Sequence, residues 1–197
     1  MISPPRINEK SFYIELNEVL NTNLVNFFQL RLKKTSTIKK FKIGKKIKKI
    51  CRDNKVKFII NDDPLLAKKL NADGCHLGQN DSTVIKARKL IKKKIIGITC
   101  HNSKKLILKA IKLKVDYIAI GAFFSSKTKK VKYKSKLSIL NYAKSITNIP
   151  IVAIGGINSS NYKKLLLNKA NFLAISGYIW KNKKLKPLEA VKKLKWK

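Results

Sequence analysis

Short apolar runs alternate with amphipathic segments along most of the chain. Seven runs have the length and the branched or aromatic content of buried strands, at residues 25–32, 56–60, 74–77, 95–100, 117–124, 149–154 and 172–179. Helical periodicity marks the segments around them, at residues 11–20, 38–51, 64–70, 83–91, 103–112, 138–145, 159–168 and 187–195. Within 103–112, Leu106, Ile107 and Ala110 share one face, while Lys105 and Lys109 point mostly to water.

Strict alternation of buried strands and helices predicts a parallel α/β sheet. An eighth strand could come only from the first residues, where Met1, Ile2 and Ser3 are available. Eight strand–helix units in 197 residues fit a (β/α)8 TIM barrel with a very short first strand better than a doubly wound sheet. Because no internal repeat or low-complexity linker divides the chain, we expect residues 1–197 to form a single domain.

The active site of such a barrel lies at the carboxyl ends of its strands. Polar, small or charged residues follow seven of the expected strands, so we expect them to meet at one rim. They are Gln29, Arg31 and Lys33; Asn61, Asp62 and Asp63; Gly78, Gln79, Asn80 and Asp81; Thr99, Cys100 and His101; residues 121–129; Gly155 and Gly156; and Ser176 and Gly177.

Two halves of this rim indicate different chemistry. Arg31 and Lys33 lie on one strand face and offer cationic donors, while Asp62 and Asp81 offer oxygen ligands. Opposite charges so placed would partly cancel unless something lies between them. A magnesium ion on the two carboxylates, carrying a diphosphate that also contacts the cations, satisfies all four side chains.

The other half follows the last two expected strands. Gly155-Gly156 and Ser176-Gly177 expose backbone N–H groups that no side chain obstructs, which is the habitual phosphate position of this fold.

Each of these residues also has an ordinary structural interpretation. Asp62 or Asp63 could cap the helix that begins at residue 64, and Asp81 could cap the helix at residue 83. His76 and His101 are more often hydrogen-bonded structural histidines than ligands. What favours a site is the joint pattern at matching strand ends.

Composition and charge change this picture little. The chain carries 46 basic and 10 acidic residues, for a net charge of +36, but only four of the basic residues are arginine. Nucleic-acid readers depend on arginine, so lysine spread over every segment favours compositional drift over a dedicated nucleic-acid function. The charge should still attract anionic substrates, and RNA nonspecifically, with a strong dependence on salt.

Other compositional features point to the cytoplasm. No apolar run reaches about 18 residues, which predicts no transmembrane helix, and the N-terminus lacks the layout of a signal peptide. Cys51, Cys75 and Cys100 are odd in number and lack a CxxC spacing, which favours reduced thiols. The expected partners are small molecules, and a homo-oligomer is compatible with the sequence.

Six motifs in order, spanning essentially the whole chain, resemble those of thiamine phosphate synthases. They are 29–33 (QLRLK), 61–62 (ND), 76–81 (HLGQND), 97–101 (GITCH), 126–129 (SKTK) and 153–157 (AIGGI). The segments 2–7 (ISPPRI) and 121–124 (GAFF) resemble an alphaproteobacterial branch. The chain departs from the usual pattern at Leu32, where an acidic residue is common, at Ala122, where proline is common, and at Ser126, where threonine is common.

The resemblance implies a TIM barrel that joins hydroxymethylpyrimidine diphosphate to thiazole phosphate, giving thiamine phosphate and diphosphate. It implies Mg²⁺ bound by Asp62 and Asp81. The pyrimidine diphosphate would be held by Gln29, Arg31, Lys33, Asn61, Thr99 and Lys129, of which Arg31, Lys33 and Lys129 would be catalytic. The thiazole phosphate would be held by Ser126, Thr128, Gly156, Ser176 and Gly177.

Two alternatives remain open at this point. Thiazole tautomerases share the fold, but their acid/base histidine follows the sixth strand, where this chain has Ala122, and they tend to lose the diphosphate-binding residues kept here. An inactive basic barrel that binds RNA is the other. Aromatic residues interleaved with arginines are missing from the sequence, which disfavours it.

Overall fold

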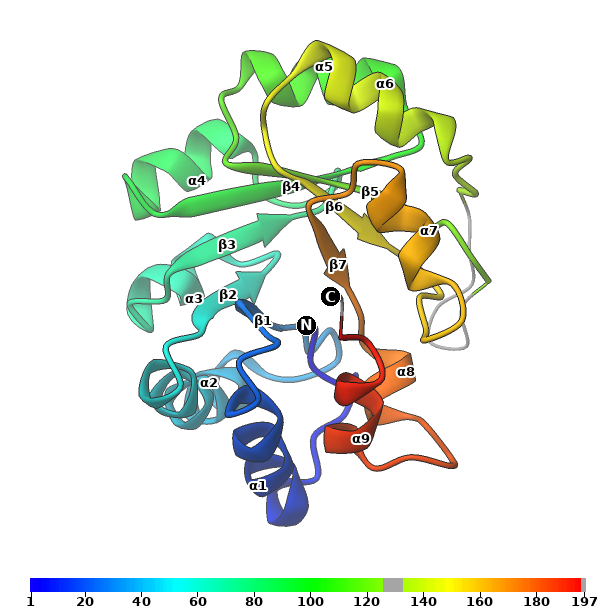
Figure 1. The fold of residues 1–197 in the computed structure, drawn as a ribbon. Helices are drawn as coiled ribbons and strands as arrows, with labels where there is room; N and C mark the ends of the chain where they lie inside the picture. Colours follow the sequence, from blue (N-terminus) through cyan, green and yellow to red (C-terminus); the bar gives the residue numbers. More distant parts are fainter. Residues whose placement is uncertain (126–132, 196–197) are drawn as a thin grey trace.

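The computed structural model describes residues 1–125 and 133–195 of the chain. Its described strands form one parallel sheet in sequence order: β1 (Phe27–Leu30), β2 (Lys57–Asn61), β3 (Gly74–Leu77), β4 (Ile95–His101), β5 (Tyr117–Gly121), β6 (Ile151–Ile154) and β7 (Phe172–Ala174). Figure 1 shows this sheet curling round inside a ring of helices. The helices are α1 (Glu9–Leu20), α2 (Thr37–Asp53), α3 (Pro64–Lys69), α4 (Val84–Ile91), α5 (Lys104–Lys112), α6 (Ser138–Ile146), α7 (Tyr162–Leu167), α8 (Gly177–Trp180) and α9 (Pro187–Lys192).

The first three residues close the barrel between its two sheet edges. On one side, Gln29 N–H donates to the Met1 carbonyl at 2.8 Å and Ser3 N–H donates to the Gln29 carbonyl at 2.9 Å. On the other side, Ile2 N–H donates to the carbonyl of Ile175, just past β7, at 2.9 Å. Figure 1 accordingly places the N-terminus between β1 and β7. The predictions of a TIM barrel and of a very short first strand are therefore confirmed.

Four strands are shorter than their apolar runs predicted: β1, β5, β6 and β7. In two of them, β5 and β7, the rest of the run leaves the sheet and is buried elsewhere. The run 172–179 leaves the sheet after Ala174 and turns into α8, where Ile179 is buried by helix packing. The run 117–124 leaves the sheet at Gly121, and Phe123 and Phe124 donate their N–H groups to carbonyls at the end of β6. Both apolar runs thus reflect burial, but only their first halves form strand pairs.

The main hydrophobic core lies between the strands and the helices. Outward-facing strand residues such as Phe28, Ile60 and Ile118 pack there against buried helix residues such as Leu16 and Ile107. Within the described residues, no helix is long and apolar enough to cross a membrane.

Candidate active site

Two carboxylates meet at the carboxyl ends of the neighbouring strands β2 and β3. Asp62 follows β2 directly and has φ +66°, with its N–H donating to the His76 carbonyl at 2.7 Å. Asp81 lies in the turn after β3 and accepts the Gly78 N–H at 2.9 Å. A methyl group on Gly78 would lie 2.4 Å from Asp81 Oδ2 and 3.8 Å from Asp62 Oδ1. The two carboxylates can approach each other because residue 78 has no side chain.

The two carboxylates act on each other's ionisation. Burial raises the pKa of Asp81, and the hydrogen bond with Asp62 and the negative charge of Asp62 raise it further. The Gly78 N–H and the Lys33 ammonium act in the opposite direction. Two carboxylates in contact resist ionising together, and a bound metal ion would relieve that repulsion.

Helix capping does not account for either carboxylate. The side chain of Asp63 caps α3 by accepting the Leu66 N–H at 2.8 Å. This confirms the interpretation of Asp63 as a helix cap. The cap of α4 is Thr83, whose hydroxyl accepts the Lys86 N–H at 3.3 Å. The alternative in which Asp81 caps this helix is therefore wrong.

The predicted cations lie on the adjoining strand end. Lys33 Nζ forms an ion pair with Asp62 Oδ2 at 3.3 Å, and more than half of the Lys33 side chain is exposed. Exposed ion pairs of this kind contribute little stability, so Lys33 is free to turn to an arriving anion. The main chain of Arg31 is anchored by Ser3, because the Arg31 N–H donates to the Ser3 hydroxyl at 2.9 Å.

A buried histidine on β3, His76, is hydrogen-bonded through both ring nitrogens. His76 Nδ1 is 2.9 Å from the Tyr117 hydroxyl and His76 Nε2 is 2.9 Å from Thr99 Oγ1. Burial lowers the pKa of His76 to about 4; Asp62 opposes this shift and Arg31 adds to it. His76 is thus a neutral, hydrogen-bonded side chain, in agreement with its structural interpretation.

The hydroxyl of Tyr117 has a second neighbour in Gln29. Burial is the main reason that the pKa of Tyr117 is raised, and a hydrogen bond from the Gln29 side chain partly offsets it. The tyrosine ring occupies the space over Gly97, where a methyl group would lie only 1.9 Å from a ring carbon. Sequence reasoning placed Tyr117 only in a strand. The signal that could have revealed it is Gly97, since glycine inside a strand often marks close approach by another group.

The remaining predicted residues follow the last two strands. Gly156, after β6, has φ +65°, and a side chain there would collide with the Ser125 carbonyl at 2.2 Å. Ser176 precedes α8 and donates its hydroxyl to the Ser3 carbonyl at 3.0 Å, while Gly177 is the first residue of that helix. Three further predicted residues lie outside the described ones: Ser126, Thr128 and Lys129.

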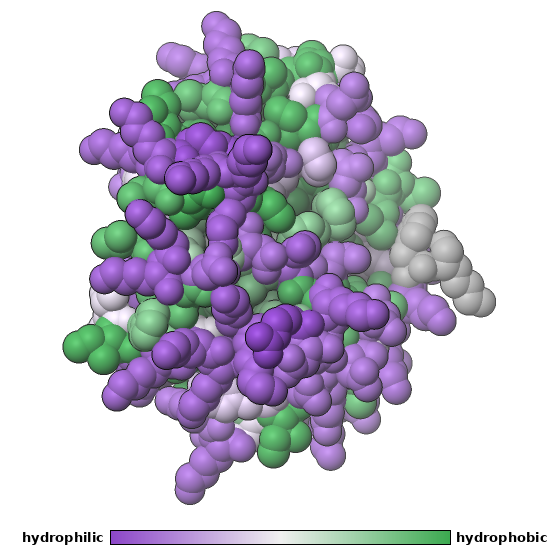
Figure 2. Space-filling model, turned by 90° about the vertical axis from the view of Figure 1, so that its left-hand side faces the viewer, coloured by the Kyte–Doolittle hydropathy of each residue, from purple (hydrophilic) through white to green (hydrophobic). Residues whose placement is uncertain are grey.

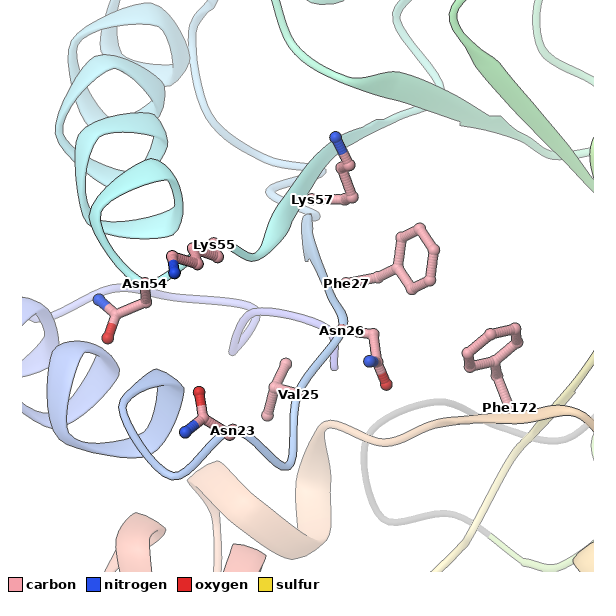
Figure 3. Close-up of a pocket in the computed structure, with 8 residues that line it drawn as sticks. All are labelled: Asn23, Val25, Asn26, Phe27, Asn54, Lys55, Lys57 and Phe172. Carbon is pink, nitrogen blue, oxygen red and sulfur yellow. The ribbon is translucent and has the colours of Figure 1, made fainter.

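A cavity of about 330 Å³ lies elsewhere in the barrel. Its lining residues come from the amino ends of β1, β2 and β7 and from the loops before them: Asn23, Val25, Asn26, Phe27, Asn54, Lys55, Lys57 and Phe172. Figure 3 shows Phe27 and Phe172 pointing toward each other, and their ring centroids are 5.4 Å apart. This ring contact and the cavity lie at the amino end of the barrel, opposite the carboxyl end that carries Asp62 and Asp81.

The carboxylate pair suits magnesium better than a metal that needs many protein ligands. No group of three or more His, Cys, Asp or Glu side chains able to hold a metal occurs in the described ranges. Magnesium keeps several water ligands and is commonly bound by one or two carboxylates together with substrate phosphates. Two carboxylates beside Arg31 and Lys33 fit that pattern.

Fold and site together define a TIM-barrel protein with a carboxylate pair and adjoining cations at the carboxyl ends of its strands. The model of the thiamine monophosphate synthase family matches residues 1–179. The chain therefore belongs to the thiamine monophosphate synthase family, and the predictions of this family and of an enzyme are confirmed.

Similar proteins support this assignment over nearly the whole chain. Thiamine-phosphate synthase of Pelagibacter ubique is 66% identical over 195 residues, covering 99% of this chain and 94% of that protein. The enzyme of the same name from Erythrobacter litoralis is 39% identical over 80% of this chain and 75% of its own length. The solved structure of thiamine phosphate pyrophosphorylase from Pyrococcus furiosus has a TM-score of 0.85 at 26% identity, covering 98% of this chain and 91% of that one. A 3-hexulose-6-phosphate synthase, with TM-score 0.66 at 15% identity, shares the fold alone.

Proposed function

We propose that this protein joins 4-amino-2-methyl-5-hydroxymethylpyrimidine diphosphate to thiazole phosphate, releasing thiamine phosphate and diphosphate. The observation that carries the proposal is the contact between Asp62 and Asp81 at adjacent strand ends, with Lys33 paired to Asp62. The names of relatives that match nearly the full chain support the same reaction.

The proposal includes a magnesium ion held by Asp62 and Asp81. When bound, the ion would supply positive charge to a diphosphate leaving group. Arg31, Lys33 and Lys129 are the cations of the chain that would neutralise the same group as it departs.

The remaining predicted residues would position the two substrates. Gln29, Asn61 and Thr99 lie on β1, β2 and β4 and would hold the pyrimidine. The thiazole phosphate would be bound by Ser126, Thr128, Gly156, Ser176 and Gly177.

The reaction is proposed to be dissociative. The C–O bond to diphosphate breaks first, the pyrimidine stabilises the resulting carbocation, and the thiazole nitrogen captures it. Such a sequence requires no protein nucleophile. Positioning and electrostatic stabilisation therefore supply the catalysis.

The test is formation of thiamine phosphate by the purified protein from its two phosphorylated halves, with and without Mg²⁺. Asp62→Ala and Asp81→Ala should each lower kcat by about 100-fold or more, because each removes stabilisation of the leaving group. Asp63→Ala is the matched control, since it removes a carboxylate that only caps α3. It should lower stability by about 1 kcal/mol and leave turnover intact.

Two outcomes would contradict the proposal. Absence of coupling at every Mg²⁺ concentration would exclude the synthase reaction, and full activity of both alanine variants would exclude the metal assignment. Thiazole tautomerisation, measured in parallel, tests the tautomerase alternative. Ala122 at the position of a tautomerase histidine disfavours that activity.

A further inference from the structure

Ser3 lies at the end of the short first strand and contacts residues of both proposed substrate sites. It is almost fully buried, with a relative exposure of 2%. Its hydroxyl accepts the Arg31 N–H at 2.9 Å and donates to the Arg31 carbonyl at 3.4 Å. Its carbonyl accepts the Ser176 hydroxyl at 3.0 Å. Ser3 therefore links the strand end that carries Arg31 to the turn that carries Ser176.

The prolines that follow Ser3 explain why its side chain makes these contacts. In the parallel ladder, the Gln29 N–H donates to the Met1 carbonyl, and the Ser3 N–H donates to the Gln29 carbonyl. One step further, a regular ladder would pair the Arg31 N–H with the Ser3 carbonyl and the Arg31 carbonyl with the N–H of residue 5. Residue 5 is Pro5, which has no N–H, so the ladder cannot continue.

The Ser3 hydroxyl replaces both of the missing ladder contacts. A hydroxyl can accept one hydrogen and donate its own. Here it accepts from the Arg31 N–H and donates to the Arg31 carbonyl. The Ser3 carbonyl, which a regular ladder would use for Arg31, is therefore available to the Ser176 hydroxyl. One side chain thus fixes the main chain of Arg31 and leaves the Ser3 carbonyl to fix Ser176.

Arg31 depends on this contact because β1 ends one residue before it, at Leu30. Leu30 and Ile60 form the last residue pair between β1 and β2. Beyond this pair, the Ser3 hydroxyl holds the Arg31 N–H. A guanidinium binds phosphate oxygens in a fixed, forked geometry, so its contribution to diphosphate binding depends on where its main chain is held.

We propose that Ser3 is a positioning residue whose hydroxyl fixes the main chain of Arg31, so that the guanidinium meets the diphosphate already ordered. The inference rests on the proposed function, in which Arg31 binds the diphosphate and Ser176 the thiazole phosphate. Without the hydroxyl, the Arg31 N–H loses its partner, and Arg31 must be ordered each time a diphosphate binds. This ordering lowers the affinity.

Removing the hydroxyl should therefore affect one substrate and spare the other. Ser3→Ala should weaken the binding of inorganic diphosphate with Mg²⁺ about tenfold, measured by titration calorimetry, and raise the KM for the pyrimidine diphosphate by a similar factor. The KM for thiazole phosphate should change less than about threefold, because the Ser3 carbonyl that holds Ser176 is retained. Ser3→Thr keeps the hydroxyl and should restore most of the diphosphate affinity.

Ser145→Ala is the matched control. It removes a serine hydroxyl that donates to the Tyr142 carbonyl at 2.9 Å within α6. It should leave the diphosphate affinity and both KM values unchanged.

A double-mutant cycle separates positioning from a general loss of stability. In protein that already carries Arg31→Ala, no guanidinium remains to be positioned. Adding Ser3→Ala should then change kcat/KM for the pyrimidine diphosphate less than about twofold. A purely structural effect of Ser3 on barrel closure would instead lower kcat/KM by the same factor in both backgrounds. Thermal unfolding of each variant identifies any that lose the fold. If Ser3→Ala is one of them, Ser3→Cys, which fills a similar space with a weak acceptor, carries the same tests.

Three results would overturn this role of Ser3: a change in diphosphate affinity of less than about threefold, an equal effect on both substrates, or full additivity with Arg31→Ala. A wild-type protein that binds no diphosphate at any Mg²⁺ concentration would overturn it as well. If the wild-type protein forms no thiamine phosphate, yet binds diphosphate with an affinity that depends on the Ser3 hydroxyl, the proposed function fails and the positioning of Arg31 stands.

Discussion

Single residues decide how close the two carboxylates come. Gly78 leaves room for Asp81 beside Asp62, and the φ of +66° at Asp62 turns that side chain out of the line of β2. Aspartate tolerates this conformation better than most residues do. The cost of holding two acidic groups together appears in the raised pKa of Asp81.

One prediction at this scale concerns the titration of Asp81. Asp62→Asn removes both a negative charge and a carboxylate hydrogen-bond partner, and the new amide can donate to Asp81. The pKa of Asp81 should therefore fall toward its ordinary range, with burial still raising it. Carboxyl-carbon chemical shifts followed by NMR against pH, without Mg²⁺, measure this. An unchanged or higher pKa in the variant would show that Asp62 does not act on Asp81.

The role of a residue could be predicted from the sequence where it depends only on its immediate neighbours in the chain. Asp63 stands directly before Pro64, so a cap on α3 could be expected from the sequence. Asp81 and Thr83 both fit the start of α4, and only the structure shows that Thr83 takes the cap. Gly97 signals that another group approaches β4, but the Tyr117–His76 contact itself could not be predicted, because it depends on the register of three strands.

At the scale of elements, the segment Met1–Ser3 acts as a strand although it is only three residues long. Its main chain bonds to β1 and to the residue after β7, and the Trp180 indole of α8 donates to the Ile2 carbonyl at 2.8 Å. The sequence predicted this short strand because a barrel of eight strand–helix units needs one strand more than the seven longer apolar runs supply. The predicted runs overextended β1, β5, β6 and β7, since apolar composition indicates burial and does not indicate where a chain turns out of a sheet.

The hydroxyl of Ser3 links this segment to the start of the site. It is almost fully buried and accepts the Arg31 N–H at 2.9 Å. Ser3→Ala leaves that N–H without a partner, so the free energy of unfolding should fall by about 1–3 kcal/mol. Urea unfolding measures the change. Ser160→Ala, at an exposed loop position, is the control and should stay within about 0.5 kcal/mol of wild type; an equal effect of both substitutions would remove Ser3 from barrel closure.

At the scale of the whole molecule, positive charge covers much of the surface. Figure 2 shows hydrophilic side chains over most of the face formed by α2, α3 and α4. A groove of about 360 Å³ between α2 and α3 is lined by five cationic residues: Lys45, Lys48, Lys49, Arg52 and Lys69. Burial lowers the pKa of nearby Lys94, and the charge of Lys48 lowers it further. The chain as a whole thus repels itself and attracts anions.

This field predicts nucleic-acid binding of a particular kind. Lysine point charges contact phosphates without reading bases, so RNA and DNA of unrelated sequence should bind with similar affinity. Because binding by several phosphate contacts releases counterions, the affinity should fall by about 1,000-fold or more between about 50 and 200 mM salt. Fluorescence anisotropy with labelled oligonucleotides measures both properties. Binding that survives at high salt and selects one sequence would require a dedicated nucleic-acid site, and would revive the RNA-binding alternative over compositional drift.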